Sequence, residues 1–205
     1  MSLYDILNRP WIYALSQFLI APGSEYFLVR HLKRLIRTLP PGRQPVLDVG
    51  CGPASRLWKC GLKPVGIDIS EAYVEAFRQA GGEAHVGTAT DLPFADQTFG
   101  GVWCFGILHH LDDIEARKAI EEMRRVCRDG GYVAIFDAVL PRSYWTRPLA
   151  YWTRKMDRGR HVRNMEAHQR LFSGDGWRFS RLTYALTGLE GSLSILENNG
   201  TTRDG

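Results

Sequence analysis

The sequence has few of the features that mark disulfide-rich, metal-binding or membrane-spanning proteins. Its four cysteines form no C-x-x-C pair and show no metal-site spacing. The longest apolar stretch, residues 11–21, contains Ser16 and Gln17 and is shorter than the ~20 residues that cross a bilayer. No basic segment precedes an apolar run at the start, as a signal peptide requires. We therefore expect a reduced, cytoplasmic protein without a metal site.

The composition is that of one globular domain with a small excess of positive charge. Of its 205 residues, 44% are hydrophobic and 23% are charged, and the formal net charge is +4. This excess permits an anionic partner without requiring one. Residues 154–181 are rich in arginine, which suits a solvated face, an anionic small molecule or, with the interleaved aromatic residues, nucleic acid. No separate RNA-binding module is evident.

The chain is organised around a strand, a glycine turn and the start of a helix. Residues 46–49 form a short apolar run that contains Asp48, and Gly50 and Gly52 follow it. Such a run suits a strand buried on both faces of a parallel sheet. The two glycines allow a tight turn and let a ligand lie on the backbone, and the helix start behind them offers unpaired N–H groups. The pattern predicts a nucleotide-sized site at the carboxyl edge of the sheet.

Two cofactor classes compete for this turn. A dinucleotide fingerprint needs a third glycine, where this chain has Ser55. Asp68 lies at the distance of an acid that binds a ribose diol, which suits either class. Asp48 and Asp91 add negative charge, which attracts a sulfonium and repels a pyrophosphate. The residues therefore favour a cationic sulfur cofactor over a nicotinamide.

Strand and helix patterns alternate through the middle of the chain, which predicts βαβ units and a parallel sheet. Before it we expect helices over 1–23 and 24–39. A surface-lying first helix at a membrane is an alternative to a lid. A helix begun by Asp112 or Asp113 should end at residues 129–131. The last strands, 177–186 and 188–196, should form an antiparallel hairpin that turns near Thr187 and Gly188.

Five segments together resemble the class I S-adenosylmethionine-dependent methyltransferases, in the subgroup called methyltransferase type 11. They are residues 46–55, 65–70, 90–94, 99–111 and 130–132. The resemblance implies an α/β, Rossmann-like fold with a mostly parallel seven-stranded sheet, helices on both faces and a terminal antiparallel hairpin. It also implies one domain over 1–205, with a helical lid at 1–40, a cofactor-binding core at 45–140, and a substrate-side insertion and hairpin at 141–196.

The same resemblance implies where S-adenosylmethionine and its product S-adenosylhomocysteine would bind. Asp68 would accept hydrogen bonds from the ribose hydroxyls, and Asp48 would face the amino-acid end. Asp91 and Leu92 would meet the adenine. The remaining residues expected at the cofactor are Gly50, Cys51, Gly52, Ile69, Phe105 and Gly106.

We expect the methyl acceptor to bind beside His109 and His110, two adjacent histidines that follow the fourth strand. Either ring titrates near neutrality and could accept a proton from an acceptor. We take His110 as the candidate base, and Tyr13, His109 and Trp145 as acceptor-side residues. The structural alternative is that one ring packs on the cofactor while the other binds backbone.

Three functions fit the sequence. The first is methyl transfer to a small molecule that is aromatic, anionic or lipid-like, with peripheral membrane contact possible. The second is methylation of a tRNA base, and the third is non-catalytic binding of the cofactor. The oligomeric state and the methylated atom are not encoded in any recognisable pattern.

Overall fold

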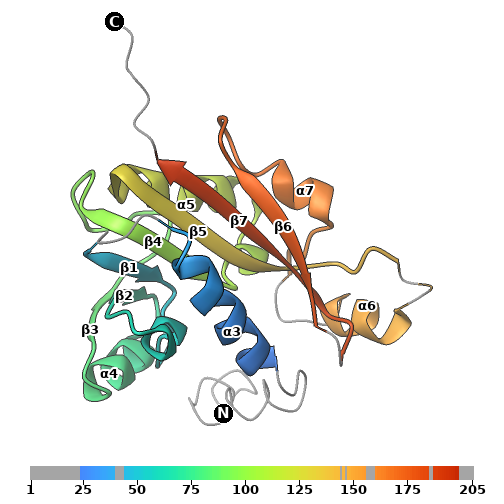
Figure 1. Ribbon diagram of the computed structural model, residues 1–205, viewed down its shortest axis with the longest axis horizontal. Coiled ribbons are helices and arrows are strands. Elements are labelled where there is room, and N and C mark those ends of the chain that lie inside the picture. The colour runs from blue at the N-terminus through green and yellow to red at the C-terminus, as the bar shows by residue number, and fades with distance from the viewer. Residues whose placement is uncertain are drawn as a thin grey trace, which may run out of the picture.

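A computed structural model describes residues 24–39, 44–143, 145, 147–155, 160–184 and 187–198 of the chain (Figure 1). The expected first helix, residues 1–23, lies outside them. Within the described residues, no helix is both long and apolar enough to cross a bilayer. The expected division of the chain into lid, core and insertion stays a prediction.

One seven-stranded sheet runs through the molecule in the order β3-β2-β1-β4-β5-β7-β6. The pairs β1–β2, β2–β3, β1–β4 and β4–β5 are parallel, whereas β5–β7 and β6–β7 are antiparallel. This confirms the expected fold class, including the terminal hairpin. The strand bounds are β1 Val46–Val49, β2 Val65–Asp68, β3 Glu83–Val86, β4 Phe99–Phe105, β5 Cys127–Val139, β6 Arg178–Thr183 and β7 Glu190–Asn198.

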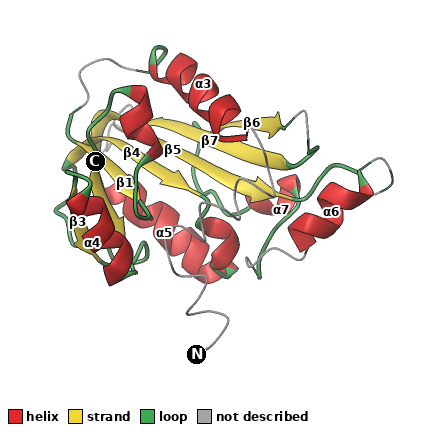
Figure 2. Cartoon of the chain, turned by 90° about the horizontal axis from the view of Figure 1, so that it is seen from below, coloured by secondary structure: helices red, strands yellow, loops and turns green. Residues whose placement is uncertain are grey.

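Helices cover both faces of this sheet (Figure 2). On one face, α3 (Ser24–Ile36) buries Leu28 and Leu32 against the aromatic side chains of β4 and β5. On the other face, α5 (Asp113–Val126) buries Ile120 and Met123. The remaining helices are η1 Arg56–Cys60, α4 Glu71–Gln79, η2 Leu108–His110, α6 Pro148–Lys155 and α7 Met165–Gln169.

Side-chain caps fix where two of these helices begin. Ser70 accepts a hydrogen bond from the Tyr73 N–H at the start of α4, as its position after β2 predicts. Asp112 rather than Asp113 caps α5, in a capping box with Glu115. Each cap satisfies N–H groups that have no partner inside the helix.

The expected end of α5 at residues 129–131 is wrong. The helix ends at Val126, and Cys127 already pairs with Phe99 as the first residue of β5. Along β5, residues 131–139 also pair with β7. Gly130 keeps a turn conformation, with φ 70°, at an irregularity in the β4–β5 pairing, so the glycines bend the strand rather than end the helix. Similarly, α3 stops at Ile36, three residues before the expected end, and Thr38 forms a turn back to Leu35.

Candidate functional site

The glycine turn after β1 folds back onto β2. Gly50 and Gly52 both have positive φ, at 68° and 60°, a conformation that favours glycine. The Gly50 N–H donates to the Ile67 carbonyl at 2.7 Å. A β-carbon added at Gly52 would meet no atom within 4 Å. The turn therefore exposes its backbone to a ligand at the carboxyl edge of the sheet.

Asp48 lies beneath this turn and is 2% exposed. Its Oδ2 accepts a hydrogen bond from the Ser55 hydroxyl at 2.5 Å, and that hydroxyl in turn accepts from the Leu57 N–H to cap η1. Burial raises the pKa of Asp48 to about 6 despite the Ser55 hydrogen bond. Its Oδ1 is buried without a hydrogen-bond partner among the described residues. This orphaned oxygen fits a ligand that brings a donor or a positive charge.

Asp68 ends β2 and links the turn to α4. Its Oδ2 accepts from the Gly52 N–H at 3.0 Å, and its Oδ1 accepts from the Ser70 N–H at 2.9 Å. The carboxylate therefore lies beside the exposed turn, and each oxygen keeps a second lone pair. The next side chain, Ile69, is 78% exposed. A carboxylate beside an open apolar side chain fits a sugar and a flat base.

The other expected cofactor residues differ in what they offer a ligand. The Cys51 side chain lies in the core cluster of Val74 and Phe77, and its N–H donates to the Ile67 carbonyl at 3.1 Å. Leu92 is 3% exposed, and its N–H donates to a Glu122 carboxylate oxygen at 2.8 Å. Asp91, by contrast, is exposed in the loop that follows β3.

The end of β4 completes this edge of the sheet. Phe105 is 8% exposed and stacks on Trp103, with ring centroids 5.7 Å apart. Gly106 turns the chain with φ 71° and donates its N–H to the Phe136 carbonyl at 2.8 Å. The turn carries the chain directly into η2, which bears the two histidines.

The two histidines have different surroundings. His109 is buried, and its Nδ1 lies 2.5 Å from Oδ1 of Asp137, which is 1% exposed. Burial alone would raise the pKa of Asp137, but the charge and hydrogen bond of His109 lower it overall. His110 is exposed, with its ring centroid 4.1 Å from that of His109. The carboxylate orients the His109 ring through its Nδ1 atom.

Asp137 is the site residue that the sequence analysis did not identify. It stands alone as an acid in the otherwise apolar run of β5 from Tyr132 to Val139, and every residue of that run is buried. A lone buried carboxylate needs a partner. The lone acid could therefore have been recognised in the sequence. Its partner, His109, could not, because it lies 28 positions away and only the fold brings it close.

Acid should destabilise the protein through His168, a buried residue near Asp137. Burial lowers the pKa of His168 from 6.5 to about 4. Between these values the unfolded chain binds a proton that the native state does not, so stability falls as pH drops from 6.5 toward 4. The loss should reach about 3 kcal/mol. Urea unfolding at several pH values measures it.

The matched variant for this prediction is His168→Gln, which removes the titrating group. Asp48 acts in the opposite direction below pH 6, because its pKa is raised by burial. The readout is therefore the difference in slope between parent and variant, rather than either slope alone. Identical slopes in the two proteins would contradict the prediction.

Arg163 holds the histidine segment in place. Its side chain is 8% exposed and forms an ion pair with Asp113 at 2.7 Å. It also donates to the carbonyls of Leu108 and Leu111, each at 2.8 Å. Nearby, the His161 N–H donates to the His109 carbonyl at 3.0 Å. Through these hydrogen bonds, the segment 160–164 holds η2 in place.

Replacing Arg163 with methionine should destabilise the protein by about 2–4 kcal/mol. The change removes the ion pair with Asp113 and the charge-assisted hydrogen bonds to the carbonyls of Leu108 and Leu111. Arg170→Met is the control, because Arg170 is exposed and such surface changes cost within about 0.5 kcal/mol. Urea unfolding of both variants provides the comparison. Equal unfolding midpoints would contradict a stabilising role of Arg163.

Two expected acceptor-side residues stay untested by these contacts. Tyr13 lies outside the described residues. Trp145 is 78% exposed in the segment between β5 and α6. In the described part of the chain, no group of three His, Cys, Asp or Glu side chains is arranged to hold a metal ion.

Comparison with known proteins connects this geometry to a family. Residues 47–135 match the family model described as a methyltransferase domain. A tRNA (carboxymethyluridine(34)-5-O)-methyltransferase of Arabidopsis thaliana is 36% identical over 105 residues, which are 49% of this chain and 25% of that protein. A demethylmenaquinone methyltransferase of Mycobacterium sp. (strain KMS) is 31% identical over 68% of this chain and 60% of its own length.

The fold has a match over nearly the whole chain. A crystal structure from Thermotoga maritima, described as an S-adenosylmethionine-dependent methyltransferase and possible histamine N-methyltransferase, superposes with a TM-score of 0.68. It covers 96% of this chain and 100% of that one, at 21% identity. Residues 47–135 therefore match the methyltransferase-domain family, and the sheet order gives the chain the fold of an S-adenosylmethionine-dependent methyltransferase.

Proposed function

We propose that the protein transfers a methyl group from S-adenosylmethionine to a hydroxyl or enol of a small, lipid-like or aromatic acceptor. The observation that supports it best is the His109–Asp137 pair at 2.5 Å, just beyond the cofactor turn. A histidine fixed by a buried carboxylate suits proton removal from an oxygen acid.

The cofactor contacts in this proposal come from the chain's own residues. Asp68 binds the ribose hydroxyls, Ile69 and Asp91 meet the adenine, and the backbone at Gly50–Gly52 lies along the amino-acid portion. The unmatched Oδ1 of Asp48 receives the charge of that portion, directly or through water. When bound, S-adenosylmethionine supplies an electrophilic methyl group. Phe105 and Gly106 shape the wall beside it.

His109 and His110 have separate roles in this proposal. Asp137 holds the His109 ring so that Nε2 accepts the acceptor's proton. His110 lies against that ring and contacts the acceptor from the exposed side. These contacts favour His109 as the base. The sequence had suggested His110 instead. Proximity of acceptor and methyl group supplies most of the remaining rate.

The second candidate is methylation of tRNA, and one observation favours it. The Arabidopsis thaliana relative named above is a tRNA methyltransferase, and it matches half of this chain. The matched segment, however, lies in the part shared by relatives with unlike acceptors. The segments outside it hold no recognisable RNA-binding module, which is why the small-molecule acceptor ranks first.

An isotope experiment separates the two. The protein is incubated with S-adenosylmethionine carrying a deuterated methyl group and with a cell extract divided into organic-soluble molecules, water-soluble small molecules and total RNA. Mass spectrometry should find the label in a small molecule, most of all in the organic-soluble fraction. Label confined to digested RNA would replace the first proposal by the second. Cofactor binding without label in any fraction would favour the non-catalytic alternative.

A further inference from the structure

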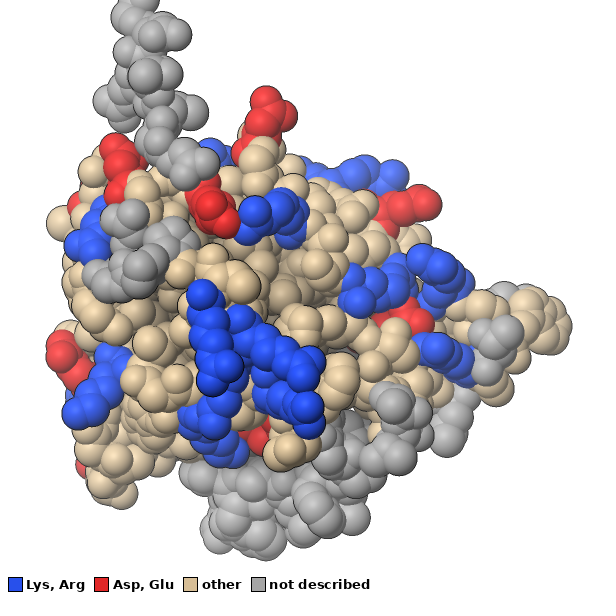
Figure 3. Space-filling model, viewed as in Figure 1, with Lys and Arg blue, Asp and Glu red and all other residues tan. Residues whose placement is uncertain are grey.

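The exposed face of α3 carries a row of four cations. Arg30, Lys33, Arg34 and Arg37 follow helical spacing along one side, and all four are exposed. They form the blue patch in the middle of Figure 3, over α3. None has a carboxylate partner within the described chain. The opposite face of α3 is already buried on the sheet.

Most other arginines of the described segments are engaged. Carboxylates or carbonyl oxygens accept hydrogen bonds from the side chains of Arg56, Arg78, Arg117, Arg124, Arg125, Arg147, Arg163, Arg178 and Arg181. The cations on α3 therefore differ from most of the other arginines, whose side chains are hydrogen-bonded within the protein. Four unpaired cations on one helix repel each other, so an external anion would stabilise them.

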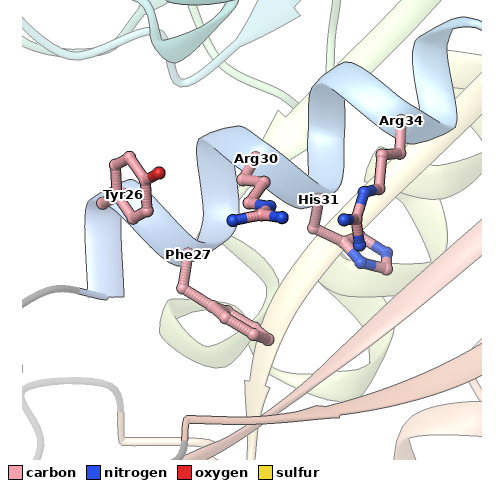
Figure 4. A pocket seen from close by; sticks show the side chains of 5 residues that line it. All are labelled: Tyr26, Phe27, Arg30, His31 and Arg34. Atoms are coloured by element: carbon pink, nitrogen blue, oxygen red, sulfur yellow. The ribbon is translucent and has the colours of Figure 1, made fainter.

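Aromatic side chains lie at the start of the same helix. Tyr26 is 73% exposed and Phe27 is 40% exposed. With Arg30, His31 and Arg34 they line an open recess of about 310 Å³ (Figure 4). The recess combines ring faces with guanidinium groups, which suits a ligand that is both anionic and partly apolar.

A second exposed aromatic pair lies on and before α6. Trp145 is 78% exposed and Trp152 is 58% exposed. Both helices flank the carboxyl edge of the sheet: Glu25 at the start of α3 pairs with Arg56, which follows β1, and α6 follows β5. Leu28 of α3 and Ala150 of α6 also belong to one core cluster. Figures 1 and 2 show the two helices on either side of that edge.

We propose that these residues form a docking surface for an anionic lipid bilayer. We call it the α3–α6 surface, and it comprises Tyr26, Phe27, Arg30, Lys33, Arg34, Arg37, Trp145 and Trp152. Lysine and arginine bind acidic headgroups, and tryptophan and tyrosine favour the headgroup level. Because the apolar face of α3 is occupied by the protein core, the contact is peripheral rather than an inserted helix.

Two features favour a bilayer over RNA as the partner. The row of cations is short, because seven residues of helix span about 10 Å, whereas single-stranded nucleic acid is held along an extended basic groove. The tryptophans lie on and just before α6, which follows the carboxyl end of β5. Docking there brings the carboxyl edge of the sheet to the membrane. The proposal concerns binding alone and does not depend on methyl transfer.

Vesicle co-sedimentation of the full chain tests the proposal. The probes are vesicles of phosphatidylcholine alone and of phosphatidylcholine mixed with phosphatidylglycerol, in the absence of S-adenosylmethionine. We expect binding to the mixed vesicles only, weakened by salt. The variant Arg30→Gln/Arg34→Gln should bind roughly tenfold to thirtyfold less. Tyr26→Ala/Trp152→Ala should lose the part of the binding that salt does not remove.

The control is Lys118→Gln/Arg170→Gln, which makes the same change in net charge. Lys118 is exposed on α5, whose buried side packs on the other face of the sheet, and Arg170 is exposed after α7. The control should bind as the native protein does. Equal losses in both charge variants would overturn the proposal in favour of a non-specific charge effect. Absence of binding to mixed vesicles, or tight binding of a single-stranded RNA oligonucleotide instead, would overturn it as well.

Discussion

Replacing Asp68 with alanine should lower the affinity for S-adenosylmethionine roughly a hundredfold. Two ribose hydroxyls donate to this carboxylate in our proposal, and each hydrogen bond to a charged group contributes about 1.5 kcal/mol or more. Together they correspond to about two decades in the dissociation constant. Isothermal titration calorimetry with S-adenosylmethionine and with S-adenosylhomocysteine measures the change.

Because Asp68 also supports the local backbone, this loss needs a structural control. Its oxygens accept from the N–H groups of Gly52 and Ser70. Ser70→Ala removes the cap of α4 and leaves the carboxylate in place, so it should cost about 1 kcal/mol of stability and little affinity. Asp175→Ala, at an exposed acid before β6, should change neither. An affinity loss in Ser70→Ala equal to that of Asp68→Ala would mean that the acid only supports the turn.

Glutamine at His109 should slow turnover while cofactor affinity stays nearly constant. Loss of a positioned general base lowers the rate by roughly a hundredfold to ten-thousandfold. The measurement is kcat with the acceptor identified by the isotope experiment, beside calorimetry with the cofactor. An equal loss of cofactor affinity would place the ring on the cofactor side of the cleft.

Two neighbouring variants show whether the His109–Asp137 pair acts as proposed. Asp137→Asn should lower kcat and shift its dependence on pH, because the amide no longer favours the protonated imidazole. His110→Gln should lower kcat less than His109→Gln does. A larger loss in His110→Gln would return the base role to His110, and an unchanged pH profile in Asp137→Asn would leave Asp137 a purely structural group.

Local patterns in the sequence determined much of the fold. The apolar run before Gly50 and Gly52 predicts β1 and its turn, and the serine after β2 predicts the start of α4. The inward positions of α5 follow from helical spacing, which places Ala116, Ile120 and Met123 in the core. These features depend on residues a few positions apart, so spacing and backbone preference suffice to predict them.

Only the tertiary structure decided the contacts between distant segments. His109 meets Asp137 because β4 and β5 are parallel neighbours, and Arg163 reaches Leu108 across 55 positions. Helix α5 ends at Val126 because Cys127 already pairs with Phe99 of β4, a contact that the local glycine signal does not reveal. The free energies of buried charges and of sheet pairing depend on neighbours that the fold supplies. The sequence by itself therefore determined the strand, the glycine turn and the strand–helix alternation, and the fold decided which histidine is held by an acid.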